Sequence, residues 1–197
     1  MDNFLGELKF ATTIDTMRVV GKESAEGESI PIEKLKDYLV WRQKEFIEKY
    51  DGARRSTEKD SYVLFTAKLN SGNELIAVIN TDMLSWDAKA SHPWVLCVEI
   101  EYVGKNSGMP EEVTYQMLEE FENDMLAKLK DADGYLNIGR QTADGIRTIY
   151  FACRDFRKPS LVVYGLSKKY ASKFKMTYDI YKDKYWRSFN RFTEGAE

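Results

Sequence analysis

The feature that most constrains this chain is the order of strand-like and helix-like periodicity from residue 93 onward. The run HPWVLCVEIEYV sets aliphatic side chains on one side of an extended chain, and Glu99 and Glu101 on the other. A helical stripe, two strand-like runs, a third run and a last strand at 174–181 follow it. Read as βαββαβ, this order predicts an α+β fold of the ferredoxin-like split βαβ kind, with both helices on one face of an antiparallel sheet.

The third run, at 158–171, leaves helix and strand open. Its LVVY core has strand propensity, whereas Pro159 near its start and SKKYA near its end favour a short helix. The βαββαβ interpretation takes this run as the second helix.

Two further regions precede this core. The runs SYVLFTAKL and ELIAVIN, separated by NSGN, predict a hairpin that extends the sheet. A helical stripe at about 30–50 predicts one amphipathic helix, and residues 4–20 read as strand or extended chain. The polar segment DGARRSTEKD then divides an N-terminal extension, 1–58, from the main domain, 59–192.

Composition narrows the class of protein. The 197 residues are 43% hydrophobic and 13% aromatic, which favours a folded globule over disorder. Two cysteines are too few for a disulfide scaffold, and the first residues lack the pattern of a secretory signal. No apolar run reaches the roughly 18–20 residues that span a bilayer. We therefore expect a cytoplasmic protein without a membrane contact.

Motifs of catalysis are missing from the sequence. The single histidine, His92, precedes a proline in a predicted loop, where we expect it to be solvated. One histidine and two separated cysteines give no zinc pattern, and no glycine-rich phosphate loop is present. We predict no catalytic residue, metal or cofactor. Glu99 and Glu101 leave open a metal or acid–base pair, although a solvated sheet face explains them. Four acids of the helical stripe that follows are expected on its polar side: Glu119, Glu120, Glu122 and Asp124.

Arginines gather around the hairpin predicted for GRQTADGIRTIYFACRD. Arg140 and Arg147 flank its turn, Arg154 and Arg157 follow it, and Tyr150 lies between them. Guanidinium groups bind carboxylate or phosphate through paired hydrogen bonds, so the cluster suits an acidic partner. A tyrosine beside an arginine is also typical of RNA-binding sheets, but the glycine-spaced aromatic pattern of such strands is missing. Structural salt bridges and plain solvation stay open as well.

The charge of the chain is unevenly distributed. Residues 154–191 hold 11 Lys and Arg against 3 Asp and Glu, a net of +8, whereas residues 1–153 have a net of -9. The basic region interleaves these charges with Tyr, Trp and Phe, a mixture that binds RNA or an acidic protein surface. A docked C-terminal segment whose lysines are solvated, or that neutralises the acidic part of its own chain, explains it too.

The motifs resemble a known family. YLNIGRQTADGIRTIYFACRD resembles the core of the bacterial family called domain of unknown function 695, and PWVLCVEIEY, SGMP and YKDKYWRSF match its other landmarks, over roughly residues 60–192. The matching positions are Gly139, Arg140, Gly145, Arg147, Tyr150, Phe151, Asp155, Asp183 and Trp186. The family usually has an aromatic residue where this chain has Ala152.

The resemblance implies a fold and a mode of action, and it supplies no agreed active site. The family is similar in fold to the regulator of ribonuclease E activity, B type, a ferredoxin-like protein that acts by binding an enzyme. It implies a non-enzymatic binding or regulatory module with a protein partner. RNA binding and an unrecognised enzyme remain alternatives, and the oligomeric state stays open. The binding residues that we predict are Arg140, Arg147, Tyr150, Arg154, Arg157, Asp183 and Trp186.

Overall fold

The computed structural model describes residues 6–105 and 108–193, and the chain divides between residues 53 and 54 into two compact units. The first unit holds two helices, α2 (Glu7–Thr13) and α3 (Leu35–Tyr50), and two short 3-10 turns, η1 (Lys22–Ser24) and η2 (Ile32–Lys34). The prediction of a helix at about 30–50 is confirmed by α3.

The prediction of an extended chain at 4–20 is wrong for the residues of α2. This segment is helical because Phe10 and Ile14 pack against Leu35 and Leu39 of the first unit, and this packing overrides the β propensity of the β-branched residues. The chain becomes extended only at Ile14, which follows the helix. Residues 4 and 5 lie outside the described part of the chain.

The second unit is an α+β structure built on one six-stranded antiparallel sheet. The strands stand in the order β1-β2-β4-β5-β3-β6, and each pairs antiparallel with its neighbours. Their bounds are β1 Tyr62–Lys68, β2 Glu74–Asn80, β3 Trp94–Glu101, β4 Tyr135–Ala143, β5 Ile146–Cys153 and β6 Lys175–Lys182. The helices are α4 Thr81–Leu84, α5 Glu112–Lys128 and α6 Arg157–Tyr170, with 3-10 turns η3 Lys89–Ser91, η4 Asp131–Asp133 and η5 Arg187–Phe192. The predicted hairpin at the start of this unit, β1–β2, does extend the sheet.

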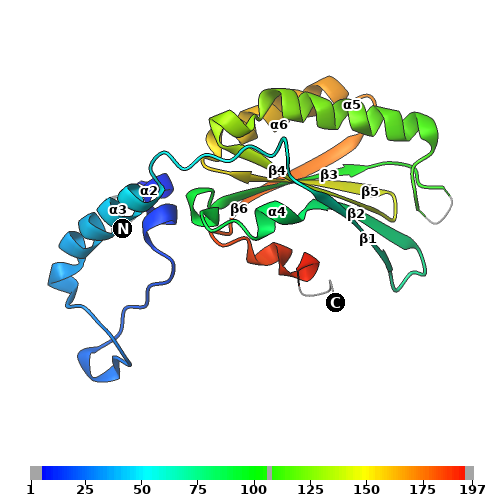
Figure 1. Cartoon of the computed structure of the whole chain (residues 1–197). Helices are drawn as coiled ribbons and strands as arrows, with labels where there is room; N and C mark the ends of the chain where they lie inside the picture. Colours follow the sequence, from blue (N-terminus) through cyan, green and yellow to red (C-terminus); the bar gives the residue numbers. More distant parts are fainter. Residues whose placement is uncertain (1–5, 106–107, 194–197) are drawn as a thin grey trace. The chain divides into compact units, whose positions relative to one another are not determined.

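Helices cover both faces of this sheet. The long helices α5 and α6 lie on one face, as predicted, and α4 and the C-terminal turn η5 lie on the other (Figure 1). On β5 the side chains alternate between the faces: Tyr150 and Ala152 join the core with Trp186 and Phe189, on the η5 side. The same alternation leaves Arg147 and Ile149 for the side of α5.

The run at 158–171 forms a helix. Pro159 falls in the first turn of α6, where a missing N–H costs nothing, and Val163, Leu166 and Tyr170 are buried at helical spacing. Packing of this stripe therefore outweighs the strand propensity of LVVY. Within the described residues, no helix combines the length and the apolar character that crossing a bilayer requires.

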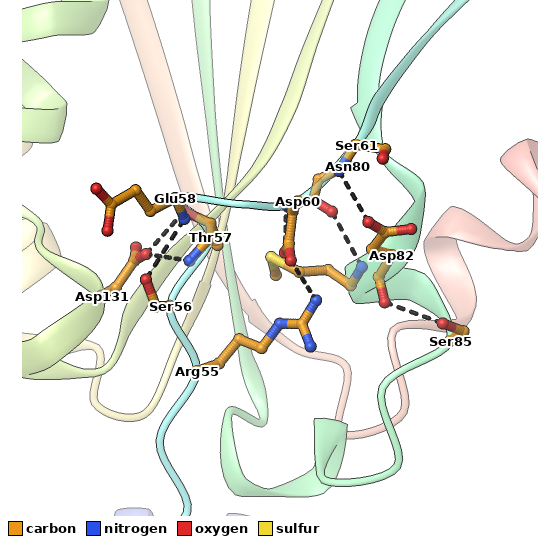
Figure 2. A network of polar contacts seen from close by, with 11 residues as sticks. Arg55, Ser56, Thr57, Glu58, Asp60, Ser61, Asn80, Asp82, Ser85 and Asp131 are labelled. Carbon is orange, nitrogen blue, oxygen red and sulfur yellow. Dashed lines mark hydrogen bonds and ion pairs between the residues drawn. The ribbon is translucent and has the colours of Figure 1, made fainter.

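Residues 55–61 belong to the second unit, and polar side chains hold them to the rest of it (Figure 2). Thr57 donates from its backbone N and its Oγ1 to Asp131 Oδ2, at 2.6 and 2.7 Å. Asp60 accepts from Arg55 Nη2 at 2.5 Å and from Asn80 Nδ2 at 2.9 Å. This polar segment, which precedes the first strand, is therefore hydrogen-bonded to η4 and to β2.

Candidate functional site

A β-bulge in β4 decides which face of the sheet Arg140 occupies. Ile138 belongs to the core on the η5 side, and strict alternation would place Arg140 there as well. The pairing of β4 with β5 shifts by one residue between Asn137 and Gly139, which turns Arg140 to the opposite face. The shift needs glycine, because Gly139 has a φ of 140° and a Cβ there would lie 2.1 Å from the carbonyl oxygen of Val78.

Arg147 reaches the same face by ordinary alternation along β5. Its side chain is 2% exposed, and its guanidinium carbon lies 4.9 Å from the ring centroid of Tyr115 on α5. Arg147 Nε donates to Thr142 Oγ1 of β4 at 3.1 Å. Among the described residues, Arg147 Nη1 has no hydrogen-bond partner although it is buried. A buried guanidinium nitrogen without an acceptor marks a position where a ligand atom would be stabilised.

Arg140 lies beside Arg147 and is held by α5. Its Nη1 donates to Glu122 Oε2 at 2.9 Å, and its Nη2 reaches the hydroxyl of Tyr115 at 3.4 Å, which is near the limit of a hydrogen bond. Glu122 is 7% exposed, so this ion pair is largely shielded from water. One buried carboxylate, that of Glu122, therefore serves two arginines.

The balance of charge in this cluster is positive. The pKa of Arg147 is lowered from its usual value, first because burial removes its hydration and then because Arg140 lies close by, while Glu122 opposes the shift. Arginine keeps its charge at neutral pH despite such a shift. Two guanidinium groups and one carboxylate leave one uncompensated positive charge, so the cluster attracts an anion.

The two arginines line a pocket of about 380 Å³ over the sheet. The other residues of its wall come from three strands, from α5 and from the loop before α5. They are Leu64, Ile76, Val78, Met109, Pro110, Tyr115 and Thr142. The pocket is therefore mostly apolar with a few polar groups, and its volume falls at the small end of the range of ligand sites. We call these nine residues the arginine pocket.

Three of the predicted site residues lie on the opposite face of the sheet. Tyr150 is buried against Phe189, and its hydroxyl accepts from Arg191 Nη2 at 3.2 Å. Burial raises the pKa of Tyr150. Asp183 accepts backbone N–H groups of η5, and Trp186 donates from Nε1 to the carbonyl of His92 at 2.9 Å. These contacts hold η5 against the sheet.

The last two predicted residues, Arg154 and Arg157, lie beyond the end of β5. The backbone N–H of Arg154 donates to the carbonyl of Gly134 at 3.0 Å. Arg157 is exposed and forms hydrogen bonds with the carboxylate of Asp155. The structure thus brings Arg140 and Arg147 together in one pocket and places the other predicted residues elsewhere.

The basic region 154–191 is engaged with acidic residues of its own unit. Several of its cations form ion pairs with carboxylates. The pairs are Arg157–Asp155, Lys158–Asp133, Lys169–Asp124, Lys173–Glu120 and Lys175–Glu101. The pairs with Asp133, Asp124, Glu120 and Glu101 support the interpretation that this region neutralises the acidic N-terminal part of its own chain, and they leave less uncompensated charge for nucleic acid.

The histidine and the two cysteines are poorly placed for catalysis or for binding a metal. The expectation of a solvated His92 is wrong: it is 1% exposed, because its ring lies 5.4 Å from that of Trp86 and Trp186, just before η5, donates to its carbonyl oxygen. Burial raises the pKa of Cys97 to about 11 and also raises the pKa of Cys153, so neither thiol is a ready nucleophile. Within the described residues, no group of three His, Cys, Asp or Glu side chains is arranged for a metal.

The sheet carboxylates are exposed, as the solvated interpretation predicts. Glu101 accepts from Lys175 Nζ at 2.7 Å, and Glu99 accepts from Thr177 Oγ1 at 3.4 Å. Both partners lie on β6, directly across from β3 in the pairing register. These contacts are cross-strand pairs of a wet sheet face.

Two residues of the site, Glu122 and Tyr115, were not predicted from the sequence. Glu122 does not lie on the polar side of α5 as expected, since it is buried beside Leu118, Phe121 and Met125. Its spacing of four from Leu118 and three from Met125 was the signal, because it places a carboxylate within the apolar stripe. A buried acid in such a stripe requires a cationic partner, which Arg140 supplies.

The arginine pocket lies within the part of the chain that matches a known family. The family model described as "Family of unknown function (DUF695)" matches residues 61–193. That range takes in the whole six-stranded sheet with α4, α5, α6 and η5. No curated protein and no solved structure matches the chain.

Proposed function

The chain belongs to the DUF695 family, and we propose that it is a non-enzymatic binding module that acts on a protein partner and receives an acidic group of that partner in the arginine pocket. The single observation that carries this proposal is Arg147, a buried arginine in the wall of a pocket whose Nη1 has no partner within residues 6–105 and 108–193. Arg140 is the second cation of the same site.

A bound carboxylate would compensate the unpaired, buried guanidinium group of Arg147. Burying a guanidinium group without an acceptor is costly, and leaving one of its N–H groups unpaired costs about 1–3 kcal/mol. A carboxylate that enters the pocket would accept from Arg147 Nη1 and would balance the excess positive charge beside Arg140. Binding energy therefore comes from a defect that the folded chain already contains.

The order of elements supports a regulatory role. In the proposed assignment, β3, α5, β4, β5, α6 and β6 form the ferredoxin-like split βαβ, since their strands stand in the order β6-β3-β5-β4. On this assignment the chain would share the fold of the regulator of ribonuclease E activity, B type, and would act in a bacterial cytoplasm by binding an enzyme. This analogy rests on fold alone, so the pocket carries the functional argument.

Two alternatives have weaker support. The ion pairs of residues 154–191 consume charge that an RNA-binding surface would offer, and Tyr150 is packed under η5 instead of facing a nucleic acid base. An enzyme that uses Glu99 and Glu101 would have to work with exposed carboxylates already paired across β3 and β6.

A comparative pull-down tests the proposed function. The full chain and a variant with Arg140→Met and Arg147→Met are used as baits in a bacterial lysate, with and without nuclease treatment. We expect a protein that survives nuclease and is lost with the double variant. A matched bait with Arg157→Met, which removes an arginine outside the pocket, should retain it. A partner that binds the double variant as well as it binds the Arg157→Met bait would refute the pocket as the binding site. Partners lost only after nuclease treatment would favour RNA.

A further inference from the structure

Resting on the proposed function, we infer that the acidic group received by the arginine pocket is the C-terminal carboxylate of the partner, carried by an apolar last residue. The pocket combines a buried cation, a single uncompensated charge and an apolar wall in one small volume. A chain terminus is the protein group that presents a carboxylate and an apolar side chain from the same carbon atom.

The charge of the pocket suits one monovalent acid. Arg140, Arg147 and Glu122 together leave a charge of +1, which a carboxylate cancels and a doubly charged phosphate would reverse. The donors on offer are also few. Among the residues that the structure describes, Arg147 Nη1 has no partner, and Arg140 Nη2 has the 3.4 Å contact with the hydroxyl of Tyr115. Two donors match the two oxygens of one carboxylate.

The depth of Arg147 favours the end of a chain. Its side chain is almost fully buried, so an acid must penetrate beyond the rim of the pocket to reach it. An internal Asp or Glu holds its carboxylate on a short stem, and its own backbone would have to follow into the apolar wall. Backbone amides buried there would lose their hydrogen bonds to water. A terminal residue enters end-on and leaves the preceding chain outside.

The apolar wall accounts for the side chain of the terminal residue. Leu64, Ile76 and Val78 present aliphatic groups from β1 and β2, and Met109 and Pro110 close the wall from the loop before α5. Leu64 is 62% exposed, so part of this wall meets water until a ligand covers it. Covering aliphatic surface on both partners adds a gain that a polar terminal residue would not give.

Tyr115 controls access to the buried nitrogen. Its ring lies over the guanidinium of Arg147, and its hydroxyl touches Arg140 Nη2. A rotation of this side chain would uncover both donors in one motion. Tyr115 is only partly buried, which leaves it room to turn. Replacement by Phe removes the contact with Arg140, so Tyr115→Phe should bind the terminus at least as well as the unaltered chain.

Fluorescence polarisation with defined peptides tests this inference. The probe is a labelled hexapeptide that ends in valine and leucine with a free carboxylate. Its C-terminal amide is the first comparison, an amide-terminated peptide with glutamate in the last position is the second, and unlabelled 4-methylpentanoate is a small competitor. We expect the free-acid peptide to bind the full chain and the amide to bind about 10- to 100-fold more weakly, the range for loss of a charge-assisted hydrogen bond.

Two variants confine the effect to the pocket. Arg147→Met should abolish the preference for the free acid. Arg147→Met alters the interior, so an exposed substitution gives a second test. Leu64→Glu adds a competing carboxylate at the rim of the pocket without disturbing the core, and it should weaken binding of the free-acid peptide. Leu161→Glu, at an exposed leucine on α6 outside the pocket, is its matched control and should bind like the unaltered chain.

Each other outcome overturns the inference in a distinct way. Equal binding of the glutamate peptide would assign the pocket to side-chain carboxylates and would leave the proposed function standing. Displacement by 4-methylpentanoate at the same concentration as the free-acid peptide would assign it to small free acids. Absence of peptide binding would reject the terminus, and the pull-down with Arg140→Met and Arg147→Met would then decide separately whether the pocket binds any protein.

Discussion

Glu122 of α5 and Arg140 of β4 form an ion pair across the interface between helix and sheet, with 2.9 Å between Oε2 and Nη1. The pair is mostly shielded from water, and it keeps Arg140 beside Arg147 in spite of their mutual repulsion. Glu122 therefore both stabilises the fold and lowers the positive charge of the arginine pocket.

Glu122→Gln should reduce the stability of the fold and increase its attraction for acids. Loss of a charged hydrogen-bond partner is expected to lower the free energy of unfolding by about 1–3 kcal/mol. The pocket then has two uncompensated charges, so acetate should raise the unfolding midpoint of the variant more than that of the unaltered chain. Thermal unfolding over an acetate series measures both effects. Acetate should have no such effect in Arg147→Met; an equal acetate effect in all three proteins would contradict the assignment.

Gly139→Ala should strongly destabilise the second unit. The new methyl group would meet the Val78 carbonyl at 2.1 Å in a backbone conformation that alanine avoids, so we expect a loss of roughly 3 kcal/mol or more. Gly165→Ala in α6 is the matched control, because nothing lies within 4 Å of its added Cβ. That change should stabilise the helix by about 0.5–1 kcal/mol. Urea denaturation distinguishes the two; a small loss at Gly139 would show that the strand pair can relax.

The buried histidine should make the protein less stable in mild acid. Burial lowers the pKa of His92 to about 3, against 6.5 in an unfolded chain, so the unfolded state binds the extra proton. Stability from this group is complete above pH 6.5 and is lost as the pH falls towards 3. Between pH 7 and pH 5 the loss is about 2 kcal/mol. Because His92 is the single histidine in the sequence, His92→Gln should flatten the unfolding free energy over that interval.

Asp183→Ala should loosen η5. Asp183 accepts from the backbone N–H groups of Arg187 and Ser188, at 2.9 and 2.8 Å, in the manner of a helix cap. Loss of a cap costs about 1 kcal/mol. Asp179→Ala on β6 is the control, since its side chain is exposed. Hydrogen exchange at η5 should rise in Asp183→Ala alone; equal exchange in both variants would show that burial of Trp186 and Phe189 is sufficient to hold the turn.

The strands and their partners could largely be predicted, because their signals are local. Alternation identified β3, turn residues identified the β4–β5 hairpin, and the order of elements led to an antiparallel sheet with α5 and α6 on one face. The helical identity of α6 depended on burial of one stripe against the sheet, which the sequence left open between two periodicities.

The candidate site could be predicted only in part, because its geometry depends on contacts distant in sequence. Arg140 and Arg147 were recognised from their chemistry, but the face that Arg140 occupies follows from the approach of Gly139 to Val78, in a strand 61 residues earlier. The packing of η5 over Tyr150 likewise joins residues that are distant in sequence. Burial of Glu122 had a local signal in its spacing from the apolar residues Leu118 and Met125. Its charge alone wrongly suggested an exposed position.

The bulge at Gly139 acts as a change of parity in β4. Before it, even-numbered residues such as Leu136 and Ile138 face η5; after it, the even-numbered Arg140 and Thr142 face α5. Straightening this bulge with the residue retained would thus exchange the faces of every later residue in the strand and move Arg140 into an apolar core, whereas deleting Gly139 would leave a regular strand in which Arg140 still faces α5. In this chain, the bulge is therefore what brings Arg140 and Thr142 to the site while Leu136 and Ile138 stay in the core on the other face.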